Sequence, residues 1–91
     1  MNDKILTKHP HGKKGVNISR EKYEVMRKTI LDLLAKSPRT HVELTTSVEA
    51  RLSGKFEGSI PWYMEATKLD LEAKKVIERV TEKGPTRYRL R

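Results

Sequence analysis

The side chains of this sequence that could do chemistry are its lysines and arginines, because they gather towards the two ends of the chain. The 91 residues carry a formal net charge of +8. Residues 1–18 contribute +3, residues 19–36 contribute +2 and residues 76–91 contribute +3, while the remainder is neutral. Exposed cations can hold nucleic-acid phosphates without reading bases, although a basic surface can also serve solubility alone. The candidate phosphate contacts are Arg79, Lys83, Arg87 and Arg89 near the C-terminus, and Lys13, Lys14 and Arg20 near the N-terminus.

Groups for other chemistry are scarce. There is no cysteine, which excludes disulfides and thiolate metal sites. The three histidines, His9, His11 and His41, include no pair at the spacing of helical metal ligands, so we expect no metal and no cofactor. Ser19 and Ser59 fit helix caps, and no glycine-rich phosphate loop joins a strand to a helix. We therefore expect that the protein is not an enzyme.

Three helices are predicted to position the cationic ends. Ser19 is a good N-cap for a first helix, whose apolar side chains recur every three or four residues until Ser37-Pro38. Thr40 and Glu43 fit a capping box for a second helix, which Gly54 would end in a left-handed conformation, with Phe56 folding into the core. A third helix begins after Ser59 and continues to about Lys75.

Extended segments are expected on both sides of the helices. Residues 76–80 and 87–91 are predicted strands, joined by a turn at 82–85. Residues 1–17 contain a cluster of glycine, proline and lysine with no helical period, and we expect a flexible basic arm. Some of its neighbouring apolar residues could pin it to the domain; these are Ile5, Leu6, Val16 and Ile18.

The third predicted helix has two apolar sides. One stripe contains Trp62, Ala66, Leu69 and Ala73, and the opposite stripe contains Ile60, Met64, Thr67 and Leu71. Either both stripes are buried, one of them under the hairpin or the arm, or one stripe binds a partner chain. For Trp62 the simpler expectation is core packing, and the alternative is a protein interface formed by Trp62, Ala66 and Leu69. The flanks mix acidic and basic residues, which weakens a groove-reading role.

The junction of this helix with the first strand resembles a known superfamily. Leu71-Glu-Ala-Lys-Lys-Val-Ile-Glu-Arg79 is similar to the end of the recognition helix in winged helix-turn-helix domains. The Trp62-Tyr63 pair and Lys68-Leu-Asp-Leu-Glu-Ala73 also resemble small prokaryotic proteins classed as a domain of unknown function. Lys75 departs from the glycine that commonly ends this helix in the family. The resemblance implies an α+β winged helix over residues 18–91, with three helices followed by a two-stranded wing.

The resemblance also implies double-stranded DNA as the partner, and a small transcriptional regulator as the role. In that reading the third helix enters the major groove and the wing meets the adjacent backbone. The residues expected to contact DNA from the helix are Ser59, Tyr63, Thr67 and Lys68. The alternative is a protein-interaction module or homodimer that does not bind DNA. No apolar run approaches the roughly 18 residues of a membrane span, and we expect a cytoplasmic protein.

Overall fold

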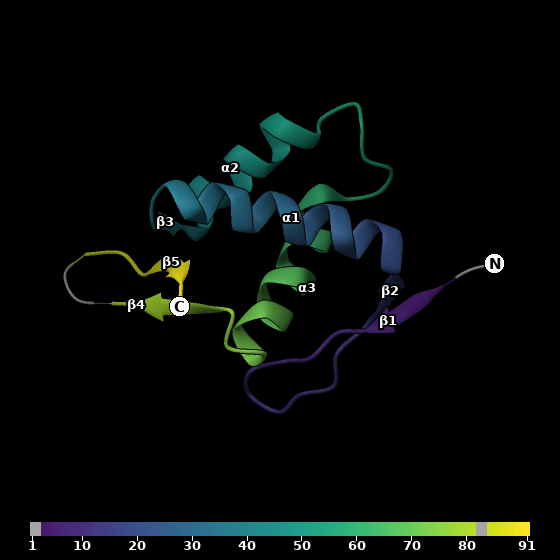
Figure 1. Cartoon of the computed structure of the whole chain (residues 1–91), viewed down its shortest axis with the longest axis horizontal. Coiled ribbons are helices and arrows are strands. Elements are labelled where there is room, and N and C mark those ends of the chain that lie inside the picture. Colours follow the sequence, from purple (N-terminus) through teal and green to yellow (C-terminus); the bar gives the residue numbers. More distant parts are fainter. Residues whose placement is uncertain (1–2, 82–83) are drawn as a thin grey trace.

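Three helices form the body of the protein, and a small sheet and an N-terminal hairpin lie beside them (Figure 1). The computed structural model describes residues 3–81 and 84–91. The helices are α1 (Arg20–Lys36), α2 (His41–Leu52) and α3 (Ile60–Ala73). The molecule is flat, with extents of 45 × 32 × 18 Å.

The helices begin where their capping residues predict. The hydroxyl groups of Ser19, Thr40 and Ser59 each accept a hydrogen bond from the backbone N–H three residues further on. Glu43 accepts one in return from the backbone N–H of Thr40, which completes the predicted capping box. Each such cap stabilises a helix by about 1 kcal/mol. Gly54, with a φ of 76°, has the left-handed conformation predicted after α2.

The last turn of α3 has an unusual residue at its end. The helix stops at Ala73, two residues before the predicted boundary, and Lys75 follows with a φ of 61°. The N–H of Lys75 donates to the carbonyl of Glu72 at 3.0 Å, and the N–H of Val76 donates to that of Leu71 at 2.9 Å. This is a Schellman motif, which usually has glycine in the left-handed position. Lys75 therefore occupies that position at a conformational cost.

A three-stranded antiparallel sheet follows the helices. Its strands are β3 (Arg39–Thr40), β4 (Ile77–Val80) and β5 (Arg87–Leu90), in the spatial order β3-β5-β4. The hairpin of β4 and β5 confirms the two predicted strands, and the turn prediction falls partly on residues 82 and 83, outside the described residues. β3 was not predicted; it lies between α1 and α2 and pairs with β5. The α+β class is confirmed, and the layout is compatible with a winged-helix-like arrangement.

The N-terminal segment forms a hairpin of its own. β1 (Lys4–Leu6) pairs antiparallel with β2 (Asn17–Ser19), where a flexible arm was expected. Thr7 holds the inner end of this hairpin, because its N–H and hydroxyl donate to the carbonyl of Val16 and its hydroxyl accepts from the N–H of Val16. Gly15 lies so close to Thr7 that a Cβ atom there would be 1.7 Å from the Thr7 carbonyl oxygen. We refer to residues 3–19 as the arm.

The hydrophobic core lies between the three helices and the sheet. It is built from apolar side chains of α1 and α2, from Met64 and Leu71 on one of the two predicted stripes of α3, and from Ile77 and Tyr88 of the sheet. Phe56 packs against this core and is partly buried, in agreement with its predicted role. Ile18 at the end of the arm is buried, while Leu6 is 59% exposed. The arm is therefore attached to the domain mainly by one of its two faces.

Candidate nucleic-acid interface

Two of the four side chains expected to contact DNA from the third helix are buried. Thr67 is fully buried and Lys68 is 2% exposed. Both lie on the side of α3 that faces the rest of the protein, so neither can contact DNA in this structure. Burial therefore argues against these two predicted contacts. Thr67 lies on the apolar stripe of α3 that also contains Met64 and Leu71, both fully buried. Lys68 was placed on a mixed-charge flank, but His41 of α2 and Tyr88 of β5 contact it.

Lys68 is held in a polar cluster between three elements. Its ammonium group lies 3.0 Å from Nδ1 of His41, donates to the hydroxyl of Tyr88 at 3.1 Å, and lies 3.3 Å from a carboxylate oxygen of Glu65. The same ammonium group is 4.3 Å from the centroid of the Tyr88 ring, a cation–π contact. A buried cation needs such partners because burial removes its hydration. Lys68 thus connects α3 to the start of α2 and to β5.

The first turn of α3 carries the other two expected contacts. Ser59 is exposed, but its hydroxyl oxygen already accepts the N–H of Trp62 at 3.3 Å. Tyr63 is half-buried, with its ring edge-on to Phe56 at a centroid distance of 5.2 Å. The ammonium group of Lys22 lies 5.1 Å from the Tyr63 ring centroid. Both residues are at the surface, and both are already engaged in contacts within the protein.

The arginines of the wing, which is the hairpin of β4 and β5, are partly neutralised. Nε of Arg79 lies 2.8 Å from a carboxylate oxygen of Glu72, and Nε of Arg89 lies 2.6 Å from one of Glu78. The hydrogen bond to Glu72 raises the pKa of the Arg79 guanidinium, against the opposing effect of burial. Arg87 is exposed and forms no ion pair with the described residues. Lys83 lies outside the described residues.

The arm, like Arg87 of the wing, presents exposed cations outside the ion pairs of the described residues. Lys13 and Lys14 are exposed, and neither forms an ion pair within residues 3–81 and 84–91. Arg20, the first residue of α1, pairs with Asp3 of the arm at 2.6 Å. Lys8 is also exposed and was not among the predicted contacts. In Figure 1 the loop of the arm and the wing lie on different sides of the C-terminal half of α3, so both basic extensions flank this helix.

A buried carboxylate anchors the arm to α3. Asp70 is fully buried and accepts the backbone N–H of Lys8 at 2.8 Å and the hydroxyl of Tyr23 at 2.5 Å. The ammonium group of Lys74 lies 3.0 Å from the same carboxylate. Burial and the hydrogen bond to Asp70 raise the pKa of the Tyr23 hydroxyl. The sequence places Asp70 and Lys74 one helical turn apart, but no sequence pattern indicates Tyr23 or the arm as partners.

The outward face of α3 is apolar and lies beside the arm. Trp62 is 47% exposed, so the expectation that it packs in the core was wrong. Ala66 and Leu69 continue this face and are half-buried, while Met64 and Leu71 on the opposite side are fully buried. A groove of about 180 Å³ separates the outward face from the arm. None of the α3 residues that line this groove is a lysine or an arginine.

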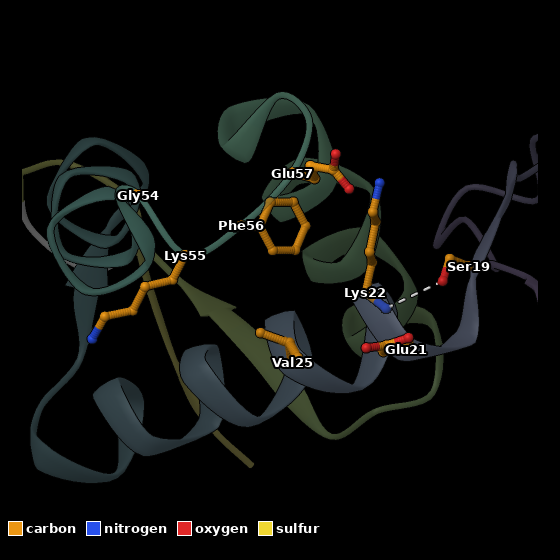
Figure 2. A pocket seen from close by; sticks show the side chains of 8 residues that line it. All are labelled: Ser19, Glu21, Lys22, Val25, Gly54, Lys55, Phe56 and Glu57. Atoms are coloured by element: carbon orange, nitrogen blue, oxygen red, sulfur yellow. Dashed lines mark hydrogen bonds between the residues drawn. The ribbon is translucent and has the colours of Figure 1, made fainter.

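A second pocket lies near the start of α1 and is drawn in Figure 2. It has a volume of about 500 Å³ and is open to solvent. Phe56 and Val25 supply its apolar surface, and its charged groups have both signs. In Figure 2 the side chain of Lys22 rises towards Glu57, and that of Lys55 points away from the pocket. This balance of charge indicates no particular ligand.

A family model matches residues 4–88, which include the arm, all three helices and most of the wing. The chain belongs to the family of unknown function DUF6958. The match begins at Lys4, the first residue of β1, so the region matched by the family model includes the arm from that residue on. No curated protein and no solved structure matches the chain.

Among residues 3–81 and 84–91, no group of three or more histidine, aspartate or glutamate side chains is placed to hold a metal ion. In the same described ranges, no helix is both long and apolar enough to cross a membrane.

Proposed function

We propose that this protein is a winged-helix-like domain that binds double-stranded DNA through the phosphate backbone, with the arm as its main contact and the wing as its second. The observation that carries the proposal is the placement of the basic residues. The two hairpins that flank α3 each contribute +3 to the net charge, counting residues 1–18 and 76–91. Both project from the helical body in Figure 1. A duplex backbone placed against them would meet cations on both sides of one helix.

The arm is the stronger of the two contacts. Lys13 and Lys14 are exposed and have no ion-pair partner in the described chain, so a phosphate would not have to displace a carboxylate. Arg79 and Arg89 in the wing would have to give up short contacts with Glu72 and Glu78. The pair of Arg89 with Glu78 is exposed and contributes only about 0–1 kcal/mol, so Arg89 can exchange its carboxylate for a phosphate. The side chain of Glu72 is only 8% exposed, so releasing Arg79 would leave a nearly buried carboxylate without its cation, and Arg79 is the weaker contact.

Base reading by α3 has little support in the structure. Thr67 and Lys68 are buried, and the outward face of α3 offers mainly apolar side chains together with Glu65. Reading the major groove requires exposed donors and acceptors that can reach base edges. Sequence-specific transcription regulation would need such a surface. We therefore propose backbone binding with little sequence preference, in place of the major-groove reading expected from the resemblance.

Salt dependence tests this proposal directly. The affinity for a generic DNA duplex, measured by fluorescence anisotropy, should fall steeply between about 50 and 200 mM salt. Replacing Lys13 and Lys14 together by alanine should weaken binding and reduce the slope of log affinity against log salt by roughly 2. The matched control replaces Lys36 and Lys55, two exposed lysines that lie outside both hairpins. Equal losses in the two double variants, or no binding at the lower salt concentration, would contradict the proposal.

The exposed tryptophan favours a second candidate function. Trp62, Ala66 and Leu69 form an apolar surface next to the arm, and exposed aromatic residues are common anchors of protein interfaces. In this alternative the face binds a protein partner or a second copy of the chain, and the basic hairpins serve solubility. Association would then depend weakly on salt and would be lost on replacing Trp62 by alanine, which sedimentation velocity can measure.

A further inference from the structure

The groove between the arm and α3 combines an aromatic surface with a basic rim. Its apolar lining includes Trp62, Ala66 and Leu69 of α3 and Val16 of the arm. Lys8, His9 and Lys14 also line it, all from the arm. Because the arm is fastened to Asp70 and closed by the contacts between Thr7 and Val16, this arrangement is part of the folded domain.

The indole of Trp62 is held in place but only half covered. Its ring meets the ring of Tyr63 edge to face, with a centroid distance of 4.9 Å and an interplanar angle of 81°. Tyr63 is itself held by Phe56 in a similar edge-on contact. Trp62 remains 47% exposed despite this support. An oriented and accessible indole is suited to stacking on another flat ring.

We propose that this groove binds an unpaired base of a single-stranded nucleic acid, with the base stacked on Trp62 and its phosphates held by Lys8 and Lys14. Proteins that bind single strands commonly combine aromatic platforms with a cationic path for the backbone. The inference rests on the proposed function, because both need the basic arm to hold phosphate. It adds a substrate class: nucleic acid with a single-stranded stretch beside or in place of a duplex.

Size and charge favour this occupant over others. A volume of about 180 Å³ is smaller than the roughly 300–1,000 Å³ of sites for drug-sized ligands, and it suits one ring system. The rim is cationic, which favours an anionic chain. Glu65 is the one carboxylate in the lining, and one of its oxygens lies 3.3 Å from the ammonium group of Lys68. Its charge is therefore largely offset within the protein.

The single tryptophan makes the proposal directly measurable. Trp62 is the only tryptophan of the chain, so its fluorescence reports on this groove alone. An oligothymidylate of about ten nucleotides should bind and quench this fluorescence, because a stacked base contacts the indole. Trp62→Ala should weaken binding of the oligothymidylate by about 5- to 150-fold and leave binding of a duplex unchanged. Trp62→Phe keeps a stacking face and should retain most of the affinity.

Val42→Ala is the matched control, since Val42 is an exposed apolar residue of α2, outside the groove. It should bind both nucleic acids as the unaltered protein does. Suppose that the protein binds the duplex, but that the oligothymidylate does not quench Trp62 fluorescence and that Trp62→Ala binds the oligothymidylate as tightly as the unaltered protein does. This inference is then overturned and the proposed function stands. If neither nucleic acid binds, both are overturned. Quenching by polyglutamate without binding of the oligothymidylate would also overturn the inference and assign the groove to an acidic protein partner.

Discussion

Replacing Lys75 by glycine should make this protein more stable. Lys75 has a φ of 61°, in the left-handed region that side chains with a Cβ atom disfavour. It stays there because two backbone hydrogen bonds of the Schellman motif, from the N–H groups of Lys75 and Val76, close the end of α3. Glycine can make the same hydrogen bonds without the steric cost.

The expected gain follows from two opposing effects. A left-handed conformation costs a residue other than glycine about 1–2 kcal/mol. Glycine loses about 0.5–1 kcal/mol more conformational entropy on folding than alanine does. The net gain should therefore be about 0.5–1 kcal/mol, which for a domain of this size raises Tm by about 2–8 °C.

Thermal unfolding followed by circular dichroism measures this gain. The control is Lys75→Ala, which removes the same charge and side chain but keeps the strained conformation. Lys75→Ala should change Tm little, because Lys75 is exposed and has no ion pair within the described residues. A Tm for Lys75→Gly equal to or below that of Lys75→Ala would refute this account of how α3 ends.

Two further predictions concern the buried carboxylate that anchors the arm. Asp70→Asn keeps the shape but removes the charge that faces Tyr23 and Lys74, so it should destabilise the domain by about 1–3 kcal/mol in urea unfolding. Asp32→Asn, which breaks an exposed pair with Arg51, should cost much less, and equal losses would contradict the role of burial. Stability should also fall in alkali, as measured by Tm against pH. Burial and the hydrogen bond to Asp70 raise the folded-state pKa of Tyr23 above 10.0, so its contribution is complete below that pH and is lost as pH rises through the raised pKa. For Lys74, burial lowers the pKa, but hydrogen bonds to Asp70 and Tyr23 outweigh it and raise the pKa above 10.5, so the loss has the same sign. Tyr23→Phe should reduce this alkaline loss, and an unchanged pH profile would argue against the network.

The helices could be predicted because their signals are local. Ser19, Thr40 and Ser59 precede apolar stripes, and a cap needs only residues within one turn to act. The wing strands could also be predicted, because charged and apolar residues alternate from Arg87 to Leu90 and a turn sequence precedes them. β3 was missed because a strand of two residues has no period to detect, and its pairing with β5 is set by tertiary structure.

The candidate site was harder to predict because it depends on contacts distant in sequence. The composition of the arm predicts a flexible segment, yet the backbone N–H of Lys8 donates a hydrogen bond to Asp70, which is 62 residues away in sequence. From the sequence alone Lys68 is expected to be solvated, because Tyr88, which covers its ammonium group, is 20 residues away along the chain. The second stripe of α3 was recognised, but sequence could not show that the arm leaves Trp62 half exposed.

The proposed contact with phosphate is tested most directly by an amide-shift titration of isotope-labelled protein with a DNA duplex. At low salt, we predict shifts on the loop of the arm around Lys13 and Lys14 and on the wing around Arg87. The amides of the buried side of α3, around Thr67, should remain in place, and the shifts should fade as salt rises. Absence of shifts at low salt, or salt-insensitive shifts confined to the face of Trp62, would contradict the account.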